Sequence, residues 1–227
     1  MTLKKKLAIS SIAILPLLTG CAMNGLPNPA PELPDSIVEG VEKIYAGIPF
    51  ALAFEASRVR LDNEWALTAA HNELILTLTG QEYYIHPNCD VALVRLDGKQ
   101  PNYKFGLAKA FKKVTHVGYP AYMPQSSGEG IYFMDVIVEN YPECMKSMTT
   151  GSMMTGMSGG GVFNDKNELV GINHGWYNFN SFEHEGVIYD SPSVFVSFLP
   201  IIDWIEAITG KTYHIEGWDR PLKNKDT

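Results

Sequence analysis

The stretch MTGMSGGGV at residues 154–162 surrounds one serine, Ser158, with glycines. Its central GMSGG matches the pattern G-x-S-x-G, in which a nucleophilic serine stands on a sharp turn between a strand and a helix. A run of glycines also suits a phosphate-binding loop or a flexible turn. The flanking sequence must decide, because each alternative requires different neighbours.

The residues on either side of Ser158 exclude two of these alternatives. The preceding KSMTTGSMMT is polar and rich in methionine, whereas a nucleophile elbow follows an apolar strand and leads into a helix. The following GVFNDKNELVGI is typical of two strands joined by a turn. No Lys-Ser or Lys-Thr pair follows the glycines, as a phosphate-binding loop requires. A catalytic serine on another fold and a flexible turn remain.

A catalytic serine needs a base, and the base needs an orienting group. WALTAAHN at 65–72 is an apolar strand that ends in small residues and His71. YIHPNCDVALVRL at 84–96 places Asp90 at the start of another apolar strand, where a buried carboxylate is costly without a hydrogen-bonding partner. Taken singly, His71 is better interpreted as a histidine that caps a strand, and for Asp90 an aspartate that ends a turn is an equally good interpretation.

Taken together, these motifs resemble those of the chymotrypsin-like serine proteases. TAAH resembles the histidine motif, HPNCD with ALVRL the aspartate motif, and GMSGG the serine motif. The order His71, Asp90, Ser158 is that of chymotrypsin and differs from the order in α/β-hydrolases. GMSGGGVFNDKNELVGI at 156–172 is most similar to the bacterial glutamyl endopeptidase branch, and the whole resemblance spans roughly 41–210.

The resemblance implies an all-β fold of two antiparallel six-stranded β-barrels and a C-terminal α-helix, with the active site between the barrels. It implies a serine endopeptidase in which Ser158 attacks the peptide carbonyl, His71 is the base and Asp90 orients His71. The backbone N–H groups of Gly156 and Ser158 would form the oxyanion hole. The residues that correspond to substrate-binding positions are Ser152, Asn173, His174 and Gly175. The expected partner is a polypeptide substrate, with no cofactor and no metal.

Three departures from the family pattern bear on specificity and activation. Ser152 stands where trypsin-like members carry aspartate, so a preference for Arg or Lys is not expected. Glutamyl endopeptidases place histidine directly after Gly-Ile, whereas here Asn173 is there and His174 follows, so preference for Glu and a surface role for His174 both stay open. Met157 replaces the aspartate that binds a freed amino terminus in mammalian members, so we expect no activating cleavage at IVEG, residues 37–40.

Short apolar runs and turn residues divide the folded part into two predicted barrels joined by GKQPNYKFG. The first, about 41–97, is compact because His71 and Asp90 are only 19 residues apart; the second covers about 108–198. A helix is expected over about 198–209, ending at Gly210. The candidate strands are 41–46, 50–56, 65–69, 73–79, 81–85 and 90–96, then 113–118, 131–139, 160–163, 168–173 and 193–198.

The N-terminus has the features of an export signal. Three lysines at positions 4–6 precede LAISSIAILPLL, which is too short for a bilayer span of about 20 residues. LTGC at 18–21 resembles the bacterial lipobox, which implies a signal peptide over 1–20 and a lipid on Cys21. Alanine at position 22 favours the outer membrane, facing the periplasm of the cell envelope. Residues 21–36 contain four prolines and are predicted to tether a protease domain at 37–227.

Composition and motifs argue against two further classes of function, nucleic-acid binding and zinc-dependent proteolysis. The 227 residues are 45% hydrophobic and carry a net charge of −7, with no basic patch for nucleic acid. No H-E-x-x-H motif supports a zinc protease. Cys89 and Cys144 can pair in an oxidising compartment, but the sequence does not show whether they come close enough. The alternative to an enzyme is a catalytically silent binding module on the same fold.

Overall fold

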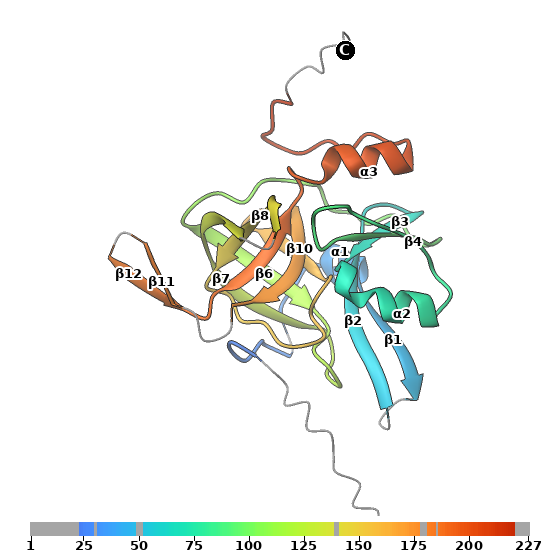
Figure 1. Cartoon of the computed structure of the whole chain (residues 1–227), viewed down its shortest axis with the longest axis horizontal. Helices are drawn as coiled ribbons and strands as arrows, with labels where there is room; N and C mark the ends of the chain where they lie inside the picture. Colours follow the sequence, from blue (N-terminus) through green and yellow to red (C-terminus); the bar gives the residue numbers. More distant parts are fainter. Residues whose placement is uncertain are drawn as a thin grey trace, which may run out of the picture.

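The computed structural model describes residues 23–29, 31–48, 52–138, 141–177, 181–184 and 186–220. Its five-stranded sheet and its barrel lie side by side (Figure 1). In chain order the elements are α1 (Asp35–Gly40), β1 (Val41–Ile48), β2 (Leu52–Arg60), β3 (Trp65–Thr68), η1 (Ala70–Asn72), α2 (Glu73–Leu78), β4 (Glu82–Ile85), β5 (Ala92–Arg95), β6 (Lys112–Gly118), β7 (Ser126–Val138), β8 (Tyr141–Thr149), β9 (Gly161–Asn164), β10 (Leu169–Trp176), β11 (Ser181–His184), β12 (Val187–Asp190), β13 (Ser193–Ser197) and α3 (Ile202–Thr209).

The N-terminal half forms an antiparallel five-stranded sheet in the order β1-β2-β3-β5-β4. This sheet is not closed, so the predicted six-stranded first barrel is not found in the described part of the chain. The expected strand over 73–79 is wrong, because these residues form α2. Ile75 and Leu76 are buried while Leu74 and Leu78, four apart, are exposed, and this is helical spacing. Leucine also favours helix over strand.

The C-terminal half confirms the predicted six-stranded barrel, which closes in the order β10-β13-β8-β7-β6-β9. Strands β9 and β13 consist almost entirely of buried residues, as expected for strands inside a closed core. Strand β8 was not expected, because YPECMKSMT carries polar residues among its apolar ones. The β11–β12 hairpin was also missed, and it projects from the barrel on the side away from the first sheet (Figure 1).

One hydrophobic core joins both halves to the C-terminal helix. Leu67 and Leu93 of the first sheet share this core with Phe163 and Phe198 of the second half, and with Ile205 of α3. Helix α3 begins four residues after the predicted start at 198 and ends at Gly210, whose φ of 68° suits glycine. Because the core is continuous, packing holds the two halves in a fixed relative position beside the candidate site.

The IVEG residues lie in α1, and Ile37 is buried in the shared core. Ile37 is therefore an internal core residue in this structure. Residues 1–22, with the predicted signal peptide and Cys21, lie outside the described residues. Within the described ranges, no helix is long and apolar enough to cross a membrane.

Candidate active site

His71 and Asp90 meet where β3 ends and β5 begins, at one end of two inner strands of the first sheet. The 3₁₀ turn η1 follows β3 and carries His71, while Asp90 lies just before β5, the neighbour of β3 in the sheet. Asp90 Oδ2 is 2.6 Å from His71 Nδ1, and Asp90 Oδ1 accepts the backbone N–H of His71 at 2.8 Å. Both carboxylate oxygens thus hold His71. With its proton on Nδ1, the ring keeps a lone pair on Nε2 to act as a base.

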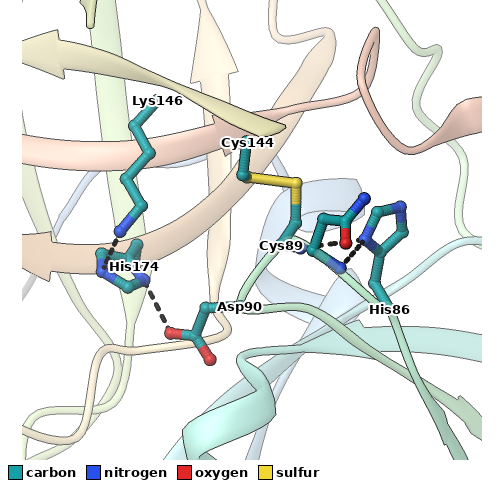
Figure 2. The surroundings of a disulfide bond; sticks show 7 residues. His86, Cys89, Asp90, Cys144, Lys146 and His174 are labelled. Atoms are coloured by element: carbon teal, nitrogen blue, oxygen red, sulfur yellow. Dashed lines mark hydrogen bonds and ion pairs between the residues drawn. A yellow bond between two sulfur atoms is a disulfide. The ribbon is translucent and has the colours of Figure 1, made fainter. Parts of the chain in front are cut away.

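A second histidine contacts the same carboxylate. His174 Nδ1 is 2.7 Å from Asp90 Oδ2, although the ring is not aligned for a regular hydrogen bond. Lys146 Nζ lies 2.9 Å from His174 Nε2, so Lys146, His174 and Asp90 form a row (Figure 2). Burial alone would raise the pKa of Asp90, but His174 and His71 outweigh it and hold that pKa well below its ordinary value. His174 therefore lies within the site itself.

The nucleophile candidate Ser158 sits between two glycines that take left-handed backbone angles. Gly156 has φ 97° and Gly159 has φ 86°. A side chain on Gly159 would come within 2.1 Å of Thr68 Oγ1, so only glycine fits this close approach to the first sheet. The Ser158 Oγ donates to the backbone carbonyl of His174 at 3.1 Å.

Among the described residues, no hydrogen bond joins Ser158 Oγ to His71 Nε2. Transfer of the hydroxyl proton to His71 would require Ser158 Oγ to leave its present acceptor. Catalytic hydrogen bonds often tighten only when substrate is bound, so this arrangement is compatible with a resting site.

Residues of the N-terminal half form hydrogen bonds with the serine loop. The backbone N–H of Ser57 donates to the Ser158 carbonyl at 3.0 Å, and its Oγ donates to the Gly156 carbonyl at 2.8 Å. Asn72 Nδ2 also reaches the Ser158 carbonyl at 3.2 Å. Neither residue was predicted, because a single serine in EASRVR and an asparagine after His71 carry no motif of their own.

Two of the backbone N–H groups of the serine loop have no hydrogen-bond acceptor among the described residues. Met157 donates to the Met154 carbonyl and Gly159 donates to the Asn173 carbonyl. Within the described ranges, the N–H groups of Gly156 and Ser158 have no such acceptor. These are the two donors that the resemblance assigns to an oxyanion hole.

The predicted substrate-binding residues differ in how far they are exposed. Gly175 faces open space, since a side chain there would meet nothing within 4 Å. Ser152 is half-buried, in close contact with Gly25. Asn173 is fully buried: its Nδ2 donates to the carbonyls of Val117 and Met157, and its side chain braces the serine loop from within.

The buried His116 predicts a pH-dependent stability. Asn173 Oδ1 lies 2.7 Å from His116 Nδ1 and Thr149 Oγ1 lies 2.6 Å from Nε2, which suits a neutral ring with its proton on Nδ1. Burial lowers the pKa of His116 to about 4, from 6.5. Since the unfolded chain binds this proton first, stability is complete above pH 6.5 and falls as the pH drops towards 4. We expect the free energy of unfolding to fall by about 2 kcal/mol from this group between pH 7.5 and 5.

Urea unfolding of the wild type and of His116→Gln at both pH values measures this effect. The variant should lose most of the difference and keep a smaller part from His86, whose pKa is also lowered by burial. Equal pH dependence in the two proteins would contradict the assignment.

The pairing that the sequence left open is formed, because Cys89 and Cys144 make a disulfide. It joins the loop before β5 to β8, so it links the first sheet to the barrel one residue from Asp90 (Figure 2). The same loop is held by His86 Nδ1, which accepts the N–H groups of Asn88 and Cys89.

Loss of this disulfide should therefore destabilise the fold. For a sequence separation of 55 residues, the chain-entropy model gives about 4 kcal/mol. We expect Cys144→Ser to lower the unfolding free energy by roughly 2–4 kcal/mol, measured by denaturant unfolding. Reductant should destabilise the wild type and leave Cys144→Ser unchanged. A wild type unaffected by complete reduction would contradict this.

The ring nitrogens of His71 and His174 and the carboxylate of Asp90 also lie within 4.8 Å of one another, close enough to hold a metal ion. In the present arrangement both Nδ1 atoms face Asp90 Oδ2 at hydrogen-bonding distance. The His71 N–H thus points to where a metal would need a lone pair, so the geometry suits a histidine oriented by a carboxylate better than a metal centre.

Residues 58–172 match the model of the trypsin-like peptidase domain. This stretch is half of the chain and contains His71, Asp90 and Ser158. The chain belongs to the trypsin-like peptidase family. No curated protein matches it in sequence.

Solved structures support the trypsin-like fold. The HtrA-type protease AlgW with a decapeptide has a TM-score of 0.58 and 16% identity, with 77% of this chain and 66% of AlgW covered. AlgW with a tripeptide gives a TM-score of 0.56 and 16% identity, with 78% and 63% covered. An inactive serine-to-alanine mutant of Rv3671c from M. tuberculosis gives a TM-score of 0.56 and 14% identity, with 82% and 96% covered. This trypsin-like chain thus spans less than two thirds of the AlgW chains.

Proposed function

We propose that this trypsin-like peptidase is a serine endopeptidase that cleaves polypeptides through an acyl-enzyme on Ser158. The observation that carries the proposal is the double contact of Asp90 with His71, which leaves Nε2 available beside the loop of Ser158. Ser158 Oγ attacks the peptide carbonyl while His71 Nε2 takes its proton. His71 then gives this proton to the leaving amine, and water completes hydrolysis by the reverse roles.

Asp90 and the serine loop supply the electrostatic part of the mechanism. The carboxylate of Asp90 keeps the His71 proton on Nδ1 and stabilises the imidazolium that forms when His71 accepts the second proton. The N–H groups of Gly156 and Ser158 are proposed to donate to the carbonyl oxygen as it becomes negative. One such donor is worth about 3–4 kcal/mol of transition-state stabilisation.

The proposed substrate is an extended peptide that passes Gly175, where the open space admits another backbone. Peptides bound to AlgW agree with this substrate class. Similarity to the glutamyl endopeptidase branch rests on residues 156–172 alone. A peptide-library digest tests both points: the wild type should cleave a defined set of bonds, and enrichment of Glu before the cut would support that branch. Cleavage after mixed residues would reject the branch but not the peptidase.

No specific observation favours the second candidate function, a catalytically silent binding module. Such a module would not need a carboxylate that orients a histidine or unpaired N–H groups beside the serine.

We also propose that residues 1–20 are a signal peptide and that the chain is anchored by lipid on Cys21 to the outer membrane, facing the periplasm. The support is the LTGC sequence and the length of the apolar stretch before it. Cys21→Ser should move the protein from the membrane fraction to the soluble fraction of the envelope. Tight membrane association of this variant would contradict the anchor.

A further inference from the structure

Residues 23–28 lie against the barrel and make specific backbone contacts with it; we call them the N-terminal strap. Met23 forms an antiparallel bridge with Met154, and Asn24 N–H donates to the Met153 carbonyl at 3.2 Å. At the other end, Asn28 and Ser127 exchange two backbone hydrogen bonds of 2.7 and 2.9 Å. The strap therefore pairs with the segment that leads to Ser158 and also with β7.

The side chain of Asn24 joins two segments that are distant in sequence. Its Oδ1 accepts the N–H of Met153 at 2.7 Å. Its Nδ2 donates to the Ser191 carbonyl and to Ser193 Oγ, both at 2.8 Å. Ser193 Oγ in turn donates to the Gly151 carbonyl at 2.6 Å. One amide thus ties residues 151–153 to residues 191–193.

The strap also packs tightly against Ser152. A side chain on Gly25 would come within 2.5 Å of Ser152 Oγ, so glycine is needed for this approach. By contrast, Leu26 in the same segment is 73% exposed. The side chain of Leu26 therefore contributes little to the contact that Asn24 and Gly25 make with residues 151–153.

These contacts continue into the loop of Ser158. Met153, Met154 and Met157 are buried together in one cluster. The N–H of Met157 donates to the Met154 carbonyl at 3.1 Å, which closes the turn that contains Gly156. The strap therefore contacts Met153 and Met154, where this turn begins. The turn leads to Ser158 and contains the N–H groups of Gly156 and Ser158, which have no acceptor among the described residues.

We propose that the N-terminal strap, through Asn24, positions the loop 151–158 for catalysis and for substrate binding beside Ser152. Asn24 is a positioning residue, since it reaches the reacting groups only through Met153 and Met154. This inference rests on the proposed peptidase function. Ile37 is buried within α1 in this structure.

The test uses the full mature chain with Cys21→Ser, and compares Asn24→Ala with Leu26→Ala as the matched control. We expect Asn24→Ala to lower kcat/KM for a library-derived peptide about 10- to 100-fold, because small misplacements of a catalytic loop have effects of this size. Both kcat and KM should change, since the loop carries the nucleophile Ser158 and also Ser152, which corresponds to a substrate-binding position. Hydrogen exchange should become faster in 151–158 and stay unchanged in β1 and β5. Leu26→Ala should match its parent in all of these.

Two results would overturn the inference while the parent protein remains active. One is that Asn24→Ala has the same activity and the same hydrogen exchange as Leu26→Ala. The other is that Asn24→Ala is more active than its parent, which would mean that the strap obstructs substrate. If Asn24→Ala lacks a cooperative unfolding transition, Gly25→Ala replaces it with the same expectations. An inactive parent whose Ser158 also fails to react with a phosphonate would instead reject the proposed function.

Discussion

Replacing Ser158 with alanine is expected to lower kcat by about 10⁶-fold, as removal of the serine does in a comparable triad. The reason is that this substitution removes the hydroxyl proposed to form the acyl-enzyme. The oxyanion donors and peptide binding should remain, so a rate above that in water persists and KM changes little. Initial rates with the best library peptide measure kcat and KM separately.

The matched control is Ser181→Ala, which removes an exposed serine on β11 that contacts only Asp190 among the described residues. It should keep the parental kcat. Retention of more than about 1% activity by a pure preparation of Ser158→Ala would contradict the role of Ser158, given an expected loss of several orders of magnitude.

Replacing Asp90 with asparagine is expected to lower kcat about 10⁴-fold at pH 7. An amide can donate as well as accept, so it allows the His71 proton to move to Nε2, where it blocks proton transfer from Ser158. It also removes the negative charge that stabilises the imidazolium and that faces His174 and Lys146. The measurement is kcat at pH 7 together with circular dichroism to verify the fold.

Asp165→Asn is the control for this change, because it removes a charge from the exposed turn after β9. We expect no change in kcat. If Asp90→Asn and Asp165→Asn behave alike, Asp90 does not orient the base.

The main features of the site were predictable because they depend on local sequence. TAAH ends a buried strand, and HPNCD precedes the strand that pairs with it, so the backbone register alone brings His71 near Asp90. The glycines around Ser158 similarly indicate positive φ angles and close packing. The barrel could be predicted from short apolar runs, although β8 was missed because its polar residues interrupt the pattern.

Other features depend on contacts between distant segments and leave no local pattern. Ser57 grips the Ser158 loop across the interface between the two halves, and Asn24 joins segments more than a hundred residues away. His174 was placed on a substrate strand by its spacing, but the bulge between Asn173 and Gly175 in β10 is a tertiary feature. The helix α2 was mistaken for a strand because ELILTL suits either structure until its packing partners are known.

The most direct test of the central claim is the reaction of the mature chain with a fluorophosphonate, followed by mass spectrometric mapping of the modified peptide. We expect loss of fluoride and one phosphonyl group on Ser158, with no adduct when His71 is replaced by alanine. A folded wild-type protein that shows no adduct, or carries it on a serine other than Ser158, would show that Ser158 is not the nucleophile.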